Sequence, residues 1–156
     1  MLSYEDEIKE NYRILYSHCT NEQRRYVNQL RKRVNIEPEW YGLVSFEEGL
    51  MSMQTYCSIR NLITFPKETI VVDCGCNLAL QQVLFQDCKQ YIGIDFHVMS
   101  ESMFKNSILI QGDISDILPA LKLDGSVVGV SVLCCSYFKG DVLKVFKEKF
   151  DKLITI

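Results

Sequence analysis

The sequence predicts an α/β fold, a doubly wound parallel sheet preceded by an N-terminal helical extension. After about residue 65, short aliphatic and β-branched runs alternate with segments whose apolar residues have helical spacing. Before residue 64, no run has strand character. We therefore expect a helical extension over residues 1–64 and a sheet core over residues 65–156, packed as one compact domain. Right-handed crossovers between parallel strands predict the strand order 3-2-1-4-5.

The extension begins with two predicted helices. Apolar residues at helical spacing mark the first helix, and they are Tyr4, Ile8, Tyr12 and Leu15. Thr20 and Gln23 have the spacing of a capping box, in which each side chain satisfies the backbone amide of the other at the start of a helix. Pro38 ends this second helix, and we expect a third helix over residues 46–62, before Pro66 introduces the first strand.

The second helix carries a cluster of positive charges, here called the basic patch: Arg24, Arg25, Arg31, Lys32 and Arg33. Only Glu22 opposes these charges within residues 21–33. One interpretation is a solvated helix face. The other is a local phosphate-binding patch with Tyr26 available for stacking. Because the net charge of the whole chain is −3, the basic patch is the only segment through which the sequence would allow nucleic acid to bind.

Residues 69–95 have the pattern strand, glycine turn, helix and second strand, which is typical of a nucleotide-binding βαβ unit. A β-branched run ends at Asp73, Gly75 permits a tight turn, and residues 78–88 have helical apolar spacing. The second strand ends at Asp95, twenty residues after Gly75. At this distance a carboxylate at the strand tip can accept hydrogen bonds from ribose hydroxyls. The alternative for Asp95 is an N-cap or turn residue.

The turn also distinguishes between adenosine cofactors. It reads Gly75-Cys76-Asn77-Leu78-Ala79-Leu80 and lacks two of the three glycines that let a backbone approach a pyrophosphate. Asp73, directly before the turn, repels phosphate and attracts a cation, and S-adenosylmethionine carries an ammonium and a sulfonium group. A nicotinamide-dependent oxidoreductase is therefore disfavoured.

The segment Val72-Asp73-Cys74-Gly75-Cys76-Asn77 resembles the first motif of class I S-adenosylmethionine-dependent methyltransferases, usually written Asp-x-Gly-x-Gly-x-Gly. The resemblance extends over roughly residues 69–156 and implies a Rossmann-like fold with S-adenosylmethionine as cofactor. The cofactor contacts that it implies in this turn are Asp73, Gly75, Cys76 and Asn77. Asn77 and Ala79 stand where the second and third motif glycines are expected. Asparagine adopts left-handed conformations more readily than other non-glycine residues, and alanine adds only a methyl group.

A third strand, beginning at Ser107, ends in Gly112-Asp113, which resembles a second motif of this family. The resemblance implies that Gly112 and Asp113 lie at the adenine, that Asp113 accepts from its amino group, and that the Ile114 backbone amide donates to its ring. Phe96, next to Asp95, would offer a flat apolar face to the adenine or ribose. The alternatives are a core position for Phe96 and an N-cap role for Asp113 in a helix from Ile114 to Leu121.

The last part of the chain completes the predicted sheet. Residues 126–133 are continuously apolar, which predicts a fourth strand buried on both faces, followed by a helix over residues 142–150 and a fifth strand over residues 153–156. The final helix and antiparallel strands usual in the resembled family would then be lacking, so we expect a minimal version of the fold. An uncovered fifth strand predicts a homodimer or a protein partner at this edge or at the N-terminal helices.

Composition excludes several classes of protein. With 156 residues and 47% hydrophobic content the chain can bury one sizeable core. No apolar run approaches the ~20 residues of a membrane span, and the N-terminus is acidic, so we expect a cytoplasmic protein without a membrane segment. The seven cysteines contain no Cys-x-x-Cys pair, which favours reduced apolar side chains and no metal site. His97 is expected at the pocket rim as a surface or capping residue.

The leading hypothesis is an S-adenosylmethionine-dependent methyltransferase of unknown substrate. Methyl transfer depends largely on positioning, so the sequence need not contain an evident base, and it identifies no catalytic residue. Residues 134–138 occupy the position that faces substrate in the resembled family, and they lack the Asp/Asn-Pro-Pro-Tyr/Phe pattern associated with methylation of exocyclic amines or amides. The alternative is a catalytically inactive methyltransferase-like module that binds cofactor weakly, or not at all, and serves in protein interaction.

Overall fold

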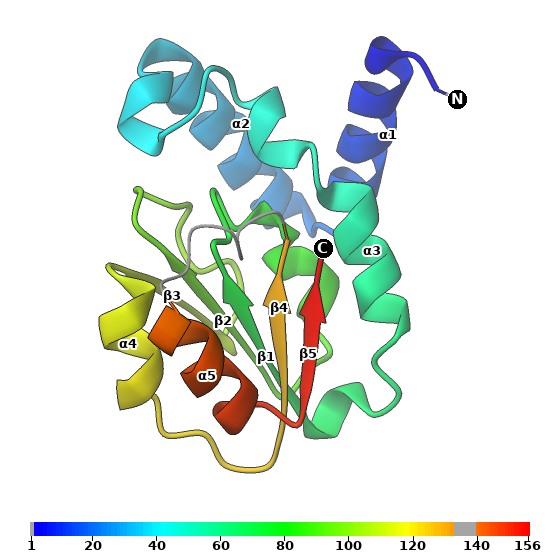
Figure 1. Cartoon of the computed structure of the whole chain (residues 1–156). Coiled ribbons are helices and arrows are strands. Elements are labelled where there is room, and N and C mark those ends of the chain that lie inside the picture. Colours follow the sequence, from blue (N-terminus) through cyan, green and yellow to red (C-terminus); the bar gives the residue numbers. More distant parts are fainter. Residues whose placement is uncertain (1, 133–139) are drawn as a thin grey trace.

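The computed structural model describes residues 2–132 and 140–156, and its centre is a five-stranded, all-parallel sheet (Figure 1). The strands are β1 (Thr69–Cys74), β2 (Gln90–Asp95), β3 (Ser107–Gln111), β4 (Ser126–Ser131) and β5 (Lys152–Thr155). Their order is β3-β2-β1-β4-β5, which confirms the predicted order and the α/β class. Strand order reverses between β1 and β4, and open α/β sheets bind ligands beside the carboxyl ends of strands at such a point.

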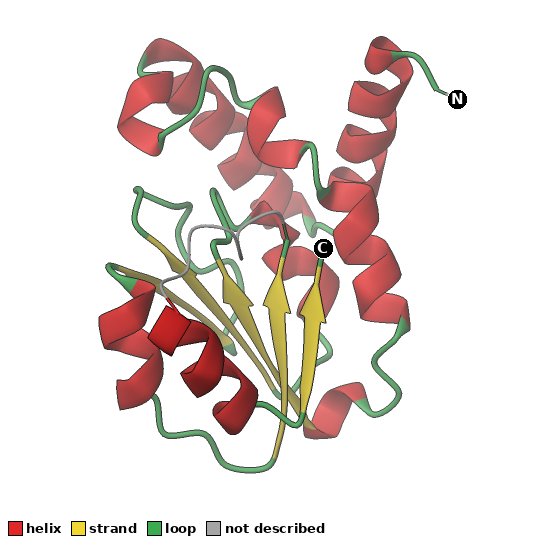
Figure 2. Ribbon diagram, viewed as in Figure 1, coloured by secondary structure: helices red, strands yellow, loops and turns green. Residues whose placement is uncertain are grey.

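The sheet divides the core into two layers because successive side chains of a strand point to opposite faces. Val71 of β1 and Val128 of β4 face the N-terminal extension, whereas Ile70 and Val72 face the other side. Helices α4 (Ile114–Ala120) and α5 (Gly140–Lys149) cover that other face (Figure 2). From its second residue on, β4 is buried, as its continuous apolar run predicts.

The N-terminal extension consists of three α-helices and two 3₁₀ segments. In chain order they are α1 (Tyr4–Ser17), α2 (Asn21–Ile36), η1 (Pro38–Tyr41), η2 (Glu47–Leu50) and α3 (Met53–Asn61), after which η3 (Pro66–Glu68) leads into β1. The predicted capping box is present: Gln23 N–H donates to the Thr20 hydroxyl at 3.1 Å, and Thr20 N–H donates to the Gln23 side chain at 2.9 Å. Among the helices of the described residues, none has the length and apolarity that crossing a membrane requires.

The predicted helical stretch over residues 46–62 is confirmed only in part. The segment is divided into η2 and α3. Gly49 lies in η2, and a β-carbon added there would come within 2.6 Å of the Leu78 side chain. Glycine has a low helix propensity, and its close approach to the turn after β1 sets the path of the chain here.

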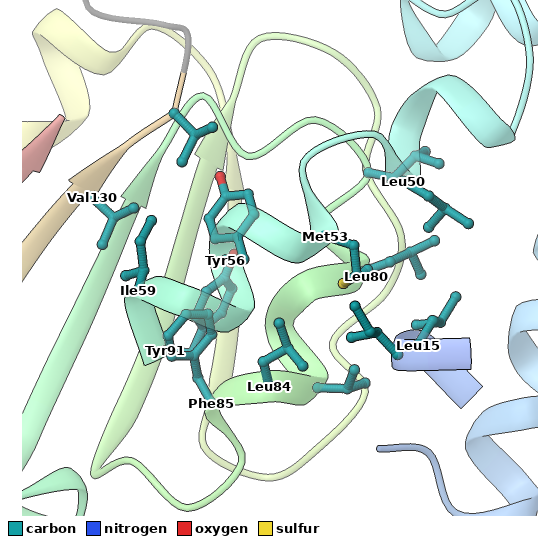
Figure 3. Packing of buried hydrophobic residues seen from close by; sticks show 14 of the residues in the cluster. Leu15, Leu50, Met53, Tyr56, Ile59, Leu80, Leu84, Phe85, Tyr91 and Val130 are labelled. Carbon is teal, nitrogen blue, oxygen red and sulfur yellow. The ribbon is translucent and has the colours of Figure 1, made fainter. Parts of the chain in front are cut away.

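The segment after β1 also differs from the prediction. Residues 78–88 were expected to form an α-helix, but the structure has only the 3₁₀ helix η4 (Leu80–Phe85), and all six of its residues are buried. Apolar spacing predicted burial correctly but did not distinguish the helix type. Phe85 stacks on Tyr91 of β2 and meets Tyr56 of α3 edge-on, so η4 lies between the sheet and the extension (Figure 3).

The extension lies over the carboxyl ends of the strands, and the strand arrows of Figure 1 point toward α1 and α2. Polar contacts connect it to the loop after β2. The Gln23 amide donates to the Met103 carbonyl at 2.9 Å, and the Tyr26 hydroxyl accepts from the Glu101 N–H at 2.6 Å. Gly42, after η1, is so close to the His97 ring that an added β-carbon would lie 2.5 Å from it. The extension therefore forms one wall of the carboxyl edge of the sheet.

Candidate functional site

The turn after β1 contains two non-glycine residues in the left-handed region. Asn77 has φ 52° and Ala79 has φ 62°, whereas Gly75 has φ 77°. The expectation of a left-handed Asn77 is confirmed. The N–H groups of Gly75 and Cys76 both donate to the Ile94 carbonyl, at 2.8 and 3.2 Å, and so attach the turn to the tip of β2.

We expect Asn77→Gly to leave cofactor binding unchanged or to strengthen it, because glycine adopts the observed φ without strain. Asn77→Val should weaken binding by roughly 1–2 kcal/mol, since a β-branched side chain is strained in this conformation. Titration calorimetry of both variants with S-adenosylhomocysteine measures the effect. Asn77 is exposed, so loss of core packing would not explain a difference between them. Equal affinities for the glycine and valine variants would contradict the prediction.

Asp95, at the end of β2, is joined to this turn. Its Oδ2 accepts a hydrogen bond from the Asn77 N–H at 2.8 Å, and its Oδ1 accepts from the His97 N–H at 2.9 Å. The carboxylate is buried, and the His97 ring nitrogen Nδ1 lies 3.3 Å from Oδ1. Asp95 therefore serves as a turn residue, one of its predicted roles. A carboxylate has about four lone-pair sites, so both oxygens retain the capacity to accept from ribose hydroxyls as well.

The predicted adenine contacts lie at the ends of β2 and β3. The Phe96 side chain is 62% exposed, so the alternative of a core phenylalanine was wrong. Gly112 N–H donates to the Asp95 carbonyl at 2.9 Å, which brings the two strand ends together. Asp113 accepts from the Ser115 N–H at 2.8 Å and caps α4, and the Ile114 side chain is buried under that helix. The N-cap prediction for Asp113 is thus confirmed, and its adenine contact stays a prediction.

Asp73 is the second-last residue of β1, but its side chain is not exposed at this edge. It is fully buried on the face of β1 covered by the extension, and three protein donors enclose its carboxylate. Oδ1 accepts from the Tyr56 hydroxyl at 2.8 Å, and Oδ2 accepts from the Tyr91 hydroxyl at 2.5 Å and the Gln81 amide at 2.9 Å. Burial raises the pKa of Asp73 to about 6, against the opposing effect of its three hydrogen bonds. Direct contact with a cofactor would require this cluster to open.

Cys76 is likewise buried beneath the turn rather than presented to a ligand. Its Sγ lies 3.4 Å from the Met99 sulfur. Burial raises the pKa of the Cys76 thiol well above its ordinary value, and the nearby carboxylates of Asp73 and Asp95 raise it further. A thiol held in its neutral form is a poor nucleophile, so Cys76 contributes packing and a backbone carbonyl.

A small polar pocket lies between the turn and the extension. Among the described residues that line it are Glu48 and Ser52 from the extension, Tyr56 from α3, and Asn77 and Gln81 from the turn and η4. Its volume of about 20 Å³ accommodates about one water molecule. Asp73 itself does not line this pocket and has no exposed surface.

Two arginines of the basic patch make contacts with other residues of the protein. Arg24 Nε donates to the Tyr16 carbonyl at 3.0 Å, and the Arg31 guanidinium lies 5.0 Å from the centre of the Tyr12 ring. Arg31 also lies 3.6 Å from a Glu47 carboxylate oxygen. These contacts favour the interpretation of a helix face over a phosphate-binding patch. Tyr26, which the sequence offered for stacking, accepts through its hydroxyl from the Glu101 N–H in the loop after β2.

The described residues contain no group of three or more histidine, cysteine or acidic side chains arranged to hold a metal. The five cysteines that the structure describes form no disulfide with one another. The predicted substrate-facing segment, including Ser136 and Tyr137, lies outside the described residues.

Sequence reasoning missed the partners of Asp73. Tyr91 is on the neighbouring strand β2, where it aligns with Val71, and therefore faces the same side as Asp73. Gly93 aligns with Asp73, and a β-carbon added to it would lie 3.0 Å from the Cys76 sulfur and 3.2 Å from the Tyr91 ring. A tyrosine within an apolar strand, two residues before a glycine, was the signal that could have indicated a buried acceptor nearby.

No protein-family model matches this sequence, and no curated protein does either. A functional assignment therefore depends on the fold and on the geometry of the site.

Proposed function

We propose that this protein is an S-adenosylmethionine-dependent methyltransferase that binds its cofactor across the carboxyl ends of β1, β2 and β3. The observation that carries the proposal is the hydrogen bond between Asp95 and the turn, in which the Asn77 N–H donates to the carboxylate at 2.8 Å. This bond joins two features that the sequence predicts separately and that are typical of a nucleoside site. One is a left-handed turn after the first strand, and the other is an acid at the tip of the second.

The residues that would hold the adenosine part fit that group. Asp95 would accept from the ribose hydroxyls through its remaining lone pairs, and Phe96 is exposed beside it for contact with the base. Asp113 and the backbone amide of Ile114 would bind the adenine edge. When bound, the cofactor supplies a methyl group on a positively charged sulfur, ready for in-line displacement.

The amino-acid tail of the cofactor does not fit the pocket beside the turn as the extension lies here. The pocket has room for about one water molecule, and Asp73 is enclosed by Tyr56, Tyr91 and Gln81. Binding of the whole cofactor would therefore require the segment that carries Glu48 and Ser52 to shift away from the turn. No contact of the tail is assigned to Asp73.

Titration calorimetry with S-adenosylmethionine, S-adenosylhomocysteine and NAD tests the proposal. We expect both adenosyl ligands to bind and NAD to give no heat, because the turn lacks the glycines that a pyrophosphate requires. Absence of binding by both adenosyl ligands to the folded protein would refute the proposal. Binding of NAD alone would favour an oxidoreductase.

The closed pocket favours a second candidate, a catalytically inactive module with the same fold that serves in protein interaction. For this candidate we expect no binding of S-adenosylhomocysteine and stable association with itself or with another protein. At the sheet edge formed by the described strands, β5 pairs only with β4, which leaves backbone groups for a partner strand. Sedimentation at micromolar concentration tests self-association, and a monomer would exclude a stable homodimer.

A further inference from the structure

The carboxylate of Asp73 is the centre of a buried hydrogen-bonded cluster, here called the Asp73 cluster, which consists of Tyr56, Asp73, Gln81 and Tyr91. Its members come from four separate elements, α3, β1, η4 and β2. Each of the three donors lies within 2.9 Å of a carboxylate oxygen, and Asp73 has no exposed surface. A ligand at the carboxyl edge therefore has no direct access to this acid.

The Asp73 cluster reaches the turn through Gln81. The Gln81 Nε2 donates to Asp73 Oδ2 and also to the Cys76 carbonyl, each at 2.9 Å. On the other side of the turn, the next residue, Asn77, donates its N–H to Asp95 at 2.8 Å. Two carboxylates therefore hold adjacent residues of the turn, Asp95 directly and Asp73 through an amide.

The turn needs such restraint because of its sequence. Asn77 and Ala79, two positions apart, both have positive φ values that cost free energy for any residue with a β-carbon. A strained backbone conformation persists only where surrounding contacts determine it. Ala79 is fully buried and immediately precedes η4, so a relaxed turn would also move the start of that helix.

We propose that Asp73 is a positioning residue that acts through Gln81 to hold the turn over residues 75–79 in its ligand-binding conformation. The bonds of the Asp73–Gln81 pair offset the backbone strain of Asn77 and Ala79, which glycine at these positions would not have. As far as it concerns cofactor affinity, this inference rests on the proposed function. The conformation of the turn can be measured without a ligand.

The test compares Gln81→Met with the double variant Gln81→Met/Ala79→Gly. Methionine is close in size to glutamine but cannot donate to Asp73 or to the Cys76 carbonyl. Glycine at position 79 removes the strain at one left-handed residue. The matched control is Gln82→Met, because Gln82 is also buried in η4 but its side chain bonds to Ser100, Glu101, Met103 and Ser107. Its bond to the turn, from its N–H to the Ala79 carbonyl, is made by the backbone and is kept in the variant.

Two quantities are measured, amide hydrogen exchange over residues 75–79 without ligand and the dissociation constant for S-adenosylhomocysteine. We expect Gln81→Met to accelerate exchange and to weaken binding by about tenfold each, the size of effect that one or two lost hydrogen bonds produce. Adding Ala79→Gly should bring both back to within about threefold of the wild type. Gln82→Met should leave both within about twofold, even if it lowers the melting temperature.

Unchanged exchange and affinity in Gln81→Met would overturn the proposal. So would losses that Ala79→Gly does not reduce, because they would indicate general destabilisation of the core. If Gln81→Met does not fold, Gln81→Asn is used, since its shorter amide cannot reach both acceptors. A wild-type protein that binds no S-adenosylhomocysteine would refute the proposed function alone, and the exchange measurements would still decide the role of the Asp73 cluster.

Discussion

Replacing Asp95 with alanine is expected to weaken the binding of S-adenosylhomocysteine by about 1.5–3 kcal/mol, roughly ten- to a hundred-fold. The variant loses the acceptor proposed for the ribose hydroxyls. It also loses the acceptor of the Asn77 N–H, so the left-handed turn is no longer attached to the end of β2. Titration calorimetry measures the change, and circular dichroism shows whether the variant is folded.

Two further variants serve as controls. Asp95→Asn retains one carbonyl acceptor and should lose less affinity than alanine does. Asp116→Ala removes an exposed acid from the first turn of α4, close in sequence to Asp113, and should leave affinity nearly unchanged. An unaltered dissociation constant in folded Asp95→Ala would place the ribose elsewhere.

The second large effect concerns pH. Burial raises the pKa of Asp73 from an ordinary value of 3.8 to about 6, so between these pH values the folded protein holds a proton that the unfolded chain has released. The contribution of Asp73 to stability is therefore greatest below pH 4 and falls as pH rises through 6. The difference amounts to about 3 kcal/mol of unfolding free energy. The groups facing this carboxylate are Tyr56, Gln81 and Tyr91, with Asp95 adding a more distant repulsion.

Denaturant titrations of wild type and Asp73→Asn at pH 4 and pH 7 test this expectation. Asparagine does not ionise. Its amide can still bond to the tyrosine hydroxyls, because a hydroxyl can donate to the amide oxygen or accept from the amide NH₂ group. The wild type should therefore lose about 2 kcal/mol of stability between pH 4 and pH 7 that Asp73→Asn does not lose. Asp87→Asn, which alters an exposed acid paired with Arg60, is the control and should show little change. Parallel pH profiles for wild type and Asp73→Asn would contradict the raised pKa.

Several features followed from neighbouring residues alone. The Thr20–Gln23 capping box and the Asp113 N-cap depend on residues three positions apart or fewer, and both are present. Strand positions depend on short apolar runs, and strand order depends on the handedness of the connections, so the whole sheet was predicted. The left-handed Asn77 was also predicted, because the geometry of a tight turn after a strand limits the conformations of its residues.

Other features depend on residues far apart in the sequence. Apolar spacing over residues 78–88 predicted a buried helix, but a 3₁₀ helix and an α-helix both satisfy such spacing in a short segment, and packing against α3 and the sheet decided between them. The break at η2 depends in the same way on the contact between Gly49 and Leu78.

The sequence by itself determined the fold class, the strand order and the helix caps, because each depends on local periodicity, chirality or short-range hydrogen bonds. Only the tertiary structure decided the role of each acid. Asp95 and Asp73 both end strand runs, but Asp95 meets the backbone of the turn, whereas Asp73 meets hydroxyls brought by α3 and β2. A carboxylate binds whichever donors surround it, and residues distant in the chain supply them.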